Sequence, residues 1–113
     1  MTALEQADKL DAIATLEELA DNLADERVAW ERLARSTPAH LPHIAMTCNE
    51  VASTADHGYK WLVRLSVRLA KDLADVDIAD AYIDAARLQL EQLRITRGSI
   101  GSIIRPAKIE AAQ

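Results

Sequence analysis

The sequence predicts an all-α protein, a three-helix bundle built on a long antiparallel helical hairpin with an apolar C-terminal tail. Its 113 residues include no Phe, 3 Gly and 3 Pro, and aromatic residues make up only 4% of the chain. The apolar residues are largely alanine and aliphatic, a composition typical of helices. Alanine fills a core poorly, so the helices must pack closely or share their faces with another chain. This length predicts a single domain over residues 1–113.

The clearest periodicity lies in the middle of the chain. Small or apolar residues recur there at steps of three or four, which predicts one helix over residues 43–75 with a single buried seam. The periodicity keeps its phase on both sides of Gly58, so we expect the helix to continue through this residue. Because glycine has no side chain, Gly58 is expected to mark a close approach between helices. The seam consists of Ile44, Cys48, Val51, Ala55, Gly58, Leu62, Leu65, Leu69 and Leu73.

The preceding segment is expected to form a first long helix over residues 2–35, which contain neither Pro nor Gly. Thr2 and Glu5 have the spacing of a capping box at its start. Apolar residues at helical spacing form a stripe that should face the core, and Glu26 interrupts this inward stripe at a heptad step. Residues 36–42 form a break, and its last residue, a proline, is suited to start the next helix. The inward stripe consists of Ala12, Leu16, Leu19, Leu23, Trp30 and Leu33, whereas Leu4, Ala7 and Leu10 project on a different side.

A third helix is expected over residues 78–97, with Asp77 as its N-cap and Gly98 just past its end. Its apolar residues form two stripes, so it should touch more than one neighbour. One stripe is Ala79, Tyr82, Ala86, Leu90 and Leu93, and the other is Ala81, Leu88 and Ile95.

The last segment, residues 98–113, is expected to be a tail, because two glycines and a proline oppose a regular helix as far as residue 106. Four isoleucines make it too apolar for a free tail, so it should lie in a groove of this chain or of a partner. These isoleucines are Ile100, Ile103, Ile104 and Ile109.

Several broad classes of protein are disfavoured. The formal net charge is −5 and the pI is about 5.1, but half of the residues are hydrophobic, which is too many for a disordered chain. No run approaches the roughly 20 apolar residues that span a bilayer, and the polar, acidic start does not resemble a signal peptide. The single cysteine, Cys48, cannot form an intramolecular disulfide. We therefore expect a cytoplasmic protein that does not bind membranes.

Catalytic motifs are missing from the sequence. There is no glycine-rich phosphate loop and no nucleophile or zinc-protease motif. Cys48 lies on the seam and His57 on the outer side of the same predicted helix, which argues against a Cys–His pair. His40 and His43, with Glu50 or His57, could hold a metal, but metal sites need three or four supported ligands. We interpret these histidines as polar loop residues and predict no enzyme activity, no metal and no cofactor.

The outer face of the central helix is the most distinctive surface. Lys60, Arg64, Arg68 and Lys71 lie at steps of four, four and three, with Trp61 at the edge of this basic strip. A basic strip beside an aromatic residue is suited to nucleic acid. An ordinary solvated helix face has the same appearance, and the acidic pI opposes a dedicated nucleic-acid binder. The third interpretation is a protein partner.

The sequence as a whole favours a non-enzymatic protein–protein interaction module, such as a small adaptor, regulator or assembly subunit. The first helix holds nine acidic against four basic residues, so a second copy could place it against the basic strip. A homodimer is the simplest expected assembly, and an accessory nucleic-acid-binding protein is the alternative. The predicted partner-binding residues are Trp61, Lys60, Arg64, Arg68, Lys71, Ile100, Ile103 and Ile104.

Overall fold

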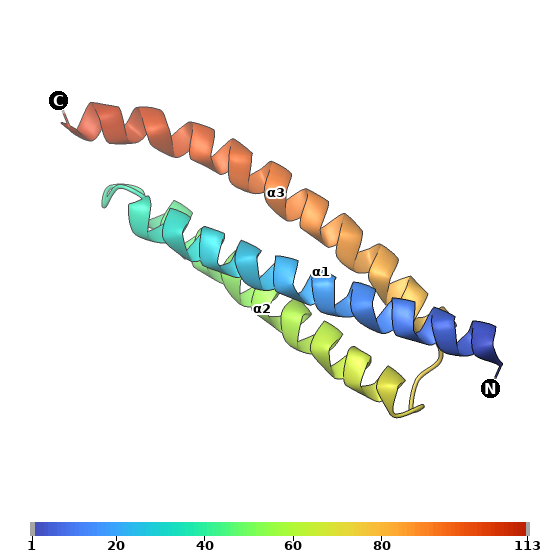
Figure 1. Cartoon of the computed structure of the whole chain (residues 1–113). Helices are drawn as coiled ribbons and strands as arrows, with labels where there is room; N and C mark the ends of the chain where they lie inside the picture. The colour runs from blue at the N-terminus through green and yellow to red at the C-terminus, as the bar shows by residue number, and fades with distance from the viewer. Residues whose placement is uncertain (1, 113) are drawn as a thin grey trace.

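A computed structural model describes residues 2–112 of the chain, with side chains through residue 110. This part is all-α and consists of three helices: α1 (Ala3–Ser36), α2 (Pro42–Ala70) and α3 (Val76–Ala112). α1 and α2 form an antiparallel hairpin, and α3 runs along it (Figure 1). The molecule is elongated, with extents of 66 × 17 × 15 Å. The predicted all-α class and the hairpin are confirmed.

The start of α1 is held by the predicted capping box. The Thr2 hydroxyl accepts a hydrogen bond from the Glu5 amide at 3.1 Å, and the Glu5 carboxylate accepts one from the Thr2 amide at 3.2 Å. Pro42 is the first residue of α2, as predicted, because this position needs no amide hydrogen. The helical hairpin therefore begins and turns where the local sequence signals place it.

α2 is continuous through Gly58 but ends at Ala70, five residues before the predicted end. The reason is a C-terminal cap in which Asp72 adopts a left-handed conformation with φ 58°. The Leu73 amide donates to the Arg68 carbonyl at 2.8 Å, and the Asp72 amide donates to the Leu69 carbonyl at 3.2 Å. This is the Schellman arrangement, which usually has glycine in place of the aspartate. Leu73 consequently leaves the seam and is 62% exposed.

α3 differs most from the prediction. The expected N-cap, Asp77, lies inside the helix, and the Asp75 carboxylate instead accepts a hydrogen bond from the Ile78 amide at 2.9 Å. The expected break at Gly98 is wrong: the helix continues through both glycines and Pro106 to Ala112. No described glycine has positive φ, and Ile104 is buried. Burial of this side chain offsets the low helix propensity of the glycines.

Replacing Gly98 and Gly101 together by alanine is expected to stabilise the protein by about 1–2 kcal/mol. Both glycines have helical backbones, and a methyl group built on either one meets nothing within 4 Å. Urea denaturation followed by circular dichroism measures the change. A lower unfolding midpoint for the double variant would show that residues 98–101 are not helical in solution.

The core is centred on α1, which packs extensively on α2 and less on α3. The largest fully buried side chains are Trp30, Leu16, Leu23, Leu69 and Cys48. At Gly58 an added Cβ would lie 3.1 Å from a Leu23 methyl carbon and 3.3 Å from the Gln89 side-chain oxygen. The predicted close approach at Gly58 is therefore confirmed. α2 and α3 make few contacts with each other, which leaves a groove between them.

Candidate functional site: the groove between α2 and α3

The groove between α2 and α3 consists of three neighbouring hollows of about 200, 80 and 250 Å³. Adjacent hollows share Trp61, Tyr82 and Gln89, so they follow one another along the two helices. The floor is provided by Leu23 and Trp30 of α1. We call this feature the α2/α3 groove. Its walls include Val51, Thr54, Gly58, Trp61, Arg64 and Arg68 of α2 and Ile78, Tyr82, Gln89, Gln92 and Thr96 of α3.

Two aromatic rings form the narrow middle of the groove. Trp61 is 46% exposed, and its ring meets Tyr82 edge to face with centroids 6.0 Å apart. The Arg64 guanidinium lies 5.6 Å from the centre of the Trp61 ring, a cation–π distance. Leu73 and Ile78 complete the adjacent hollow. This end of the groove therefore combines aromatic and aliphatic surface with positive charge.

Two residues of the basic strip, Arg64 and Arg68, form the rim of the groove on α2. Lys60, Arg64, Arg68 and Lys71 are all exposed, as predicted for an outer face. Lys60 donates to the Asp56 carboxylate at 2.9 Å. This hydrogen bond is the main reason why the pKa of Asp56 is lowered, and the positive charges of Lys60, Arg27 and His57 act in the same direction. Among residues 2–110 the other three cations of the strip form no ion pair.

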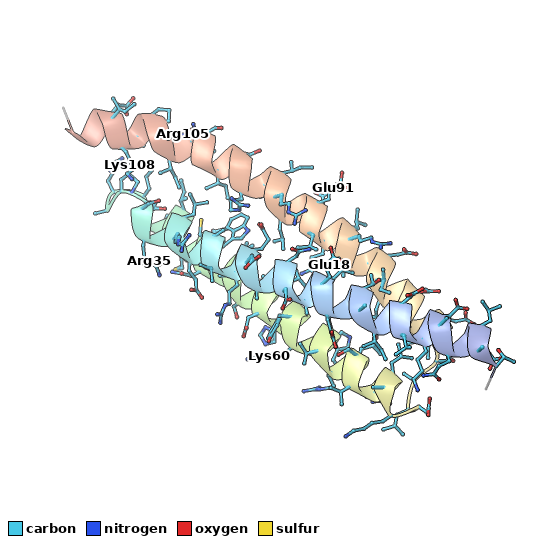
Figure 2. The ribbon with its side chains drawn as sticks, in the orientation of Figure 1. Glu18, Arg35, Lys60, Glu91, Arg105 and Lys108 are labelled. Atoms are coloured by element: carbon cyan, nitrogen blue, oxygen red, sulfur yellow. The ribbon has the colours of Figure 1, made fainter. Side chains whose placement is uncertain are left out.

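The positive residues farther along the chain do not extend this strip. Arg105 and Lys108 lie toward the C-terminal end of α3, the end of the molecule at which α1 and α2 are connected (Figure 2). The strip instead borders the first turns of α3, because Arg64 and Arg68 share a hollow with Ile78 and Tyr82. The positive charge of the site is therefore confined to one end of the groove.

A buried ion pair holds α3 on α1 beside the groove. Glu26 is only 5% exposed, and its carboxylate accepts hydrogen bonds from Arg97 Nε at 3.1 Å and from the terminal nitrogen of Arg97 at 2.9 Å. Arg94 Nε lies 3.9 Å from the same carboxylate. The sequence shows Glu26 only as an interruption of the inward stripe. An acid at such a position needs a cation nearby, and that requirement could have pointed to Arg97.

The predicted isoleucines do not form one surface. Ile104 is 2% exposed, Ile100 is partly buried against the core, and Ile103 is 57% exposed. Ile103 is therefore the only one of these three that the described chain offers openly to a partner. Tyr82 was expected in the buried stripe, but Ile83 occupies that position instead. This turns Tyr82 toward Trp61, a contact that the sequence pattern did not reveal.

The reactive side chains lie apart from one another. Cys48 is fully buried, and burial raises the pKa of its thiol, which makes it a poor nucleophile. His57 Nδ1 lies 2.9 Å from the Ser53 carbonyl oxygen. In the described part of the chain no three His, Cys, Asp or Glu residues are grouped so that they could hold a metal ion. None of the helices, over the residues described, is long and apolar enough to cross a membrane.

Comparison of the chain with protein-family models, with curated proteins and with solved structures finds no match. The function is therefore inferred from the α2/α3 groove and its rim.

Proposed function

We propose that the protein is a non-enzymatic, cytoplasmic interaction module that binds a helix of a protein partner in the α2/α3 groove. The observation that supports this proposal is the separation of α3 from α2, which leaves Trp61 half exposed between aliphatic and basic neighbours. Tryptophan and arginine are the residues most often responsible for binding energy at protein interfaces. The groove thus has the composition of a binding surface.

An α-helix is the occupant that fits the shape of the groove. The α3 wall extends from Ile78 to Thr96, and at about 1.5 Å per residue this corresponds to roughly 27 Å, or five helical turns. An amphipathic helix in a groove is a common recognition mode, with apolar anchors at steps of three or four. Because Arg64 and Arg68 border one end, the partner helix should have acidic residues at that end.

Site-specific photo-crosslinking in living cells tests this proposal. Benzoylphenylalanine placed at Tyr82 or Gln92 faces the groove, whereas the same group at the exposed Arg32 of α1 is the control. We expect light-dependent adducts with protein from both groove positions and little adduct from the control. Mass spectrometry of the adducts distinguishes a second copy from another protein. The absence of protein adducts from both groove positions would contradict the proposal.

Trp61 is expected to be the main anchor for the partner. Changing Trp61 to alanine should weaken binding by at least about 2 kcal/mol, roughly 30-fold, as for other interface tryptophans. Val67 provides a matched control, because it lies on the same helix with 45% exposure, against 46% for Trp61, and does not line the groove. The yield of the Gln92 adduct in each background measures the effect. An equal yield in the two variants would rule out Trp61 as an anchor.

Nucleic-acid binding is the second candidate function. It is favoured by three cations of the strip, Arg64, Arg68 and Lys71, which form no ion pair with another described residue and lie on the same helix as the exposed Trp61 ring. A labelled single-stranded DNA or RNA should then bind at low salt, and binding should weaken steeply as salt is added. Changing Arg64 and Arg68 to glutamate should abolish it. If the unmodified protein binds neither probe at low salt, this candidate is excluded.

A further inference from the structure

The outer face of α3 bears a stripe of small and apolar residues that no described residue covers. Ala81, Leu88, Ile95 and Ser102 follow one another at steps of seven along this helix. Leu88 is 60% exposed and Ile95 is 57% exposed. A repeat of seven keeps one narrow face of a helix in line, as in two-stranded coiled coils. We call these four residues the α3 outer stripe.

The two flanks of this stripe have opposite charge at the start of α3. On the α2 side lie Arg64 and Arg68, on the rim of the groove. On the α1 side lies a hollow of about 510 Å³ whose charged lining consists of five carboxylates and one guanidinium. No ion pair joins these carboxylates to another described residue. The charged residues of this acidic hollow are Glu5, Asp8, Asp11, Asp77, Asp80 and Arg87.

The charge distribution distinguishes between the two ways in which two copies could pair along this stripe. If the helices run antiparallel, the two-fold axis places like flanks on the same side but reverses the ends, so each acidic hollow lies beside the end of the other copy's α3, away from its basic rim. If they run parallel, the axis lies along the helices, and each basic rim lies on the same side as the partner's acidic hollow. Both features lie at the start of α3, so the parallel arrangement also brings them to the same level. Only the parallel pair brings the basic rim of one copy to the acidic hollow of the other.

Residues beside the stripe also favour the parallel arrangement. Asp84 and Glu91 flank it toward α1, whereas Ala85 and Gln92 flank it toward the groove. In a parallel pair each acid faces a neutral residue of the other copy. In an antiparallel pair centred on the stripe, Glu91 would face Glu91 of the other copy, which is unfavourable.

We propose that the α3 outer stripe binds the same stripe of a second copy in a parallel, two-fold symmetric dimer. Leu88 and Ile95 of each copy meet their counterparts across the axis, and the small Ala81 and Ser102 allow the helices to approach closely. Because each copy uses the same surface, the assembly ends at two copies. The second copy lies beside the basic rim, and the rest of the α2/α3 groove, toward Gln92 and Thr96, stays open for a partner helix. The dimer deepens the proposed function, since it rests on helix faces acting as protein-binding surfaces.

Sedimentation velocity of the full chain tests the dimer over a dilution series spanning about three orders of magnitude in concentration. The unmodified chain should convert from monomer to dimer across this series. Changing Leu88 and Ile95 to glutamate should raise the dissociation constant by at least about 100-fold. Leu4 and Leu10 changed to glutamate form the matched control, because they are similarly exposed, at 73% and 56%, and lie on α1. Circular dichroism confirms that both double variants remain helical.

Cysteine crosslinking tests the parallel arrangement. In a background with Cys48 changed to alanine, a cysteine at Ala81 alone and a cysteine at Ser102 alone should each form a disulfide-linked dimer. An antiparallel pair can link at most one of these two positions to itself. Disulfide formation at neither position, or only in a mixture of the two variants, would overturn the parallel arrangement.

The outcomes separate this dimer from the proposed function. A full chain that is monomeric at every concentration, or equal dimerisation of the stripe and control variants, would overturn the dimer. If the dimer is overturned but groove adducts with another protein still form, the proposed function stands without the dimer. If the stripe dimer forms and groove adducts are absent, the dimer stands and the groove has no partner.

Discussion

Replacing Trp30 with alanine is expected to lower the free energy of unfolding by about 3–5 kcal/mol. Trp30 is fully buried and has the largest side chain among the fully buried residues of the core. It contributes to the floor of the 250 Å³ hollow, so its loss would leave a larger cavity between the helices. The stability of a small domain is only about 5–15 kcal/mol in total, so this variant should be close to unfolding at 37 °C.

A phenylalanine at the same position separates packing from hydrogen bonding. The indole nitrogen of Trp30 is buried and has no acceptor among the described residues. Trp30→Phe therefore removes no hydrogen bond and should cost at most about 1.5 kcal/mol. Urea denaturation of the unmodified protein and of the alanine and phenylalanine variants measures the loss of unfolding free energy in each variant. If the alanine variant lost less than 1 kcal/mol, about the size of a surface effect, Trp30 would not belong to the core.

Replacing Arg97 with alanine is expected to lower the free energy of unfolding by about 2–3 kcal/mol. This change leaves the buried Glu26 carboxylate with one guanidinium, that of Arg94, at 3.9 Å. The expected cost is below that of breaking a fully buried pair, because the Arg97 side chain is 37% exposed. Arg94, with 55% exposure, should cost less than half as much when it is changed to alanine.

Removing the acid of this ion pair is expected to lower the free energy of unfolding less than removing the arginine does. With Glu26 changed to leucine, Arg97 can turn its guanidinium toward water, and the leucine fills the apolar stripe, so the cost should be below about 1 kcal/mol. Chemical denaturation of the Arg97→Ala, Arg94→Ala and Glu26→Leu variants shows which of these changes lowers the free energy of unfolding most. A Glu26→Leu variant that is less stable than Arg97→Ala would show that the pair stabilises α3 more than the buried charge costs.

The hairpin could be predicted from the sequence because its signals are local. The capping box at Thr2, the proline at Pro42 and the regular seam of α2 are all properties of neighbouring residues. The early end of α2 was missed because an aspartate, not a glycine, takes the left-handed position at Asp72. Aspartate adopts this conformation more readily than most residues, but its presence in a sequence is a weak signal.

The length of α3 was missed for a different reason. An arginine followed by glycine at residues 97 and 98 is also the usual pattern of a helix end. A longer pattern contradicts it, because the inward-facing positions of α3 continue at steps of three or four beyond Gly98. These positions are Leu90, Leu93, Arg97, Ile100 and Ile104, and all but Arg97 are apolar.

The candidate site could be predicted only in part. Trp61, Arg64 and Arg68 stood out because they share one face of a single helix, and all three line the groove. The other wall depends on α3 packing against α1 rather than α2, which no local pattern specifies. Tyr82 is an example. Successive residues of a helix point about 100° apart, so assigning the buried position to Tyr82 instead of Ile83 turns Tyr82 away from the groove.

We expect that protein covers the α2/α3 groove in the cell. Oxidative footprinting measures this directly, by comparing hydroxyl-radical modification of the chain in intact cells with that of the dilute purified protein. We predict that Trp61 and Tyr82 are protected in cells, whereas Met46, which is 56% exposed and does not line the groove, reacts equally in both. Equal modification of Trp61 relative to Met46 in cells and in the dilute protein would contradict the claim.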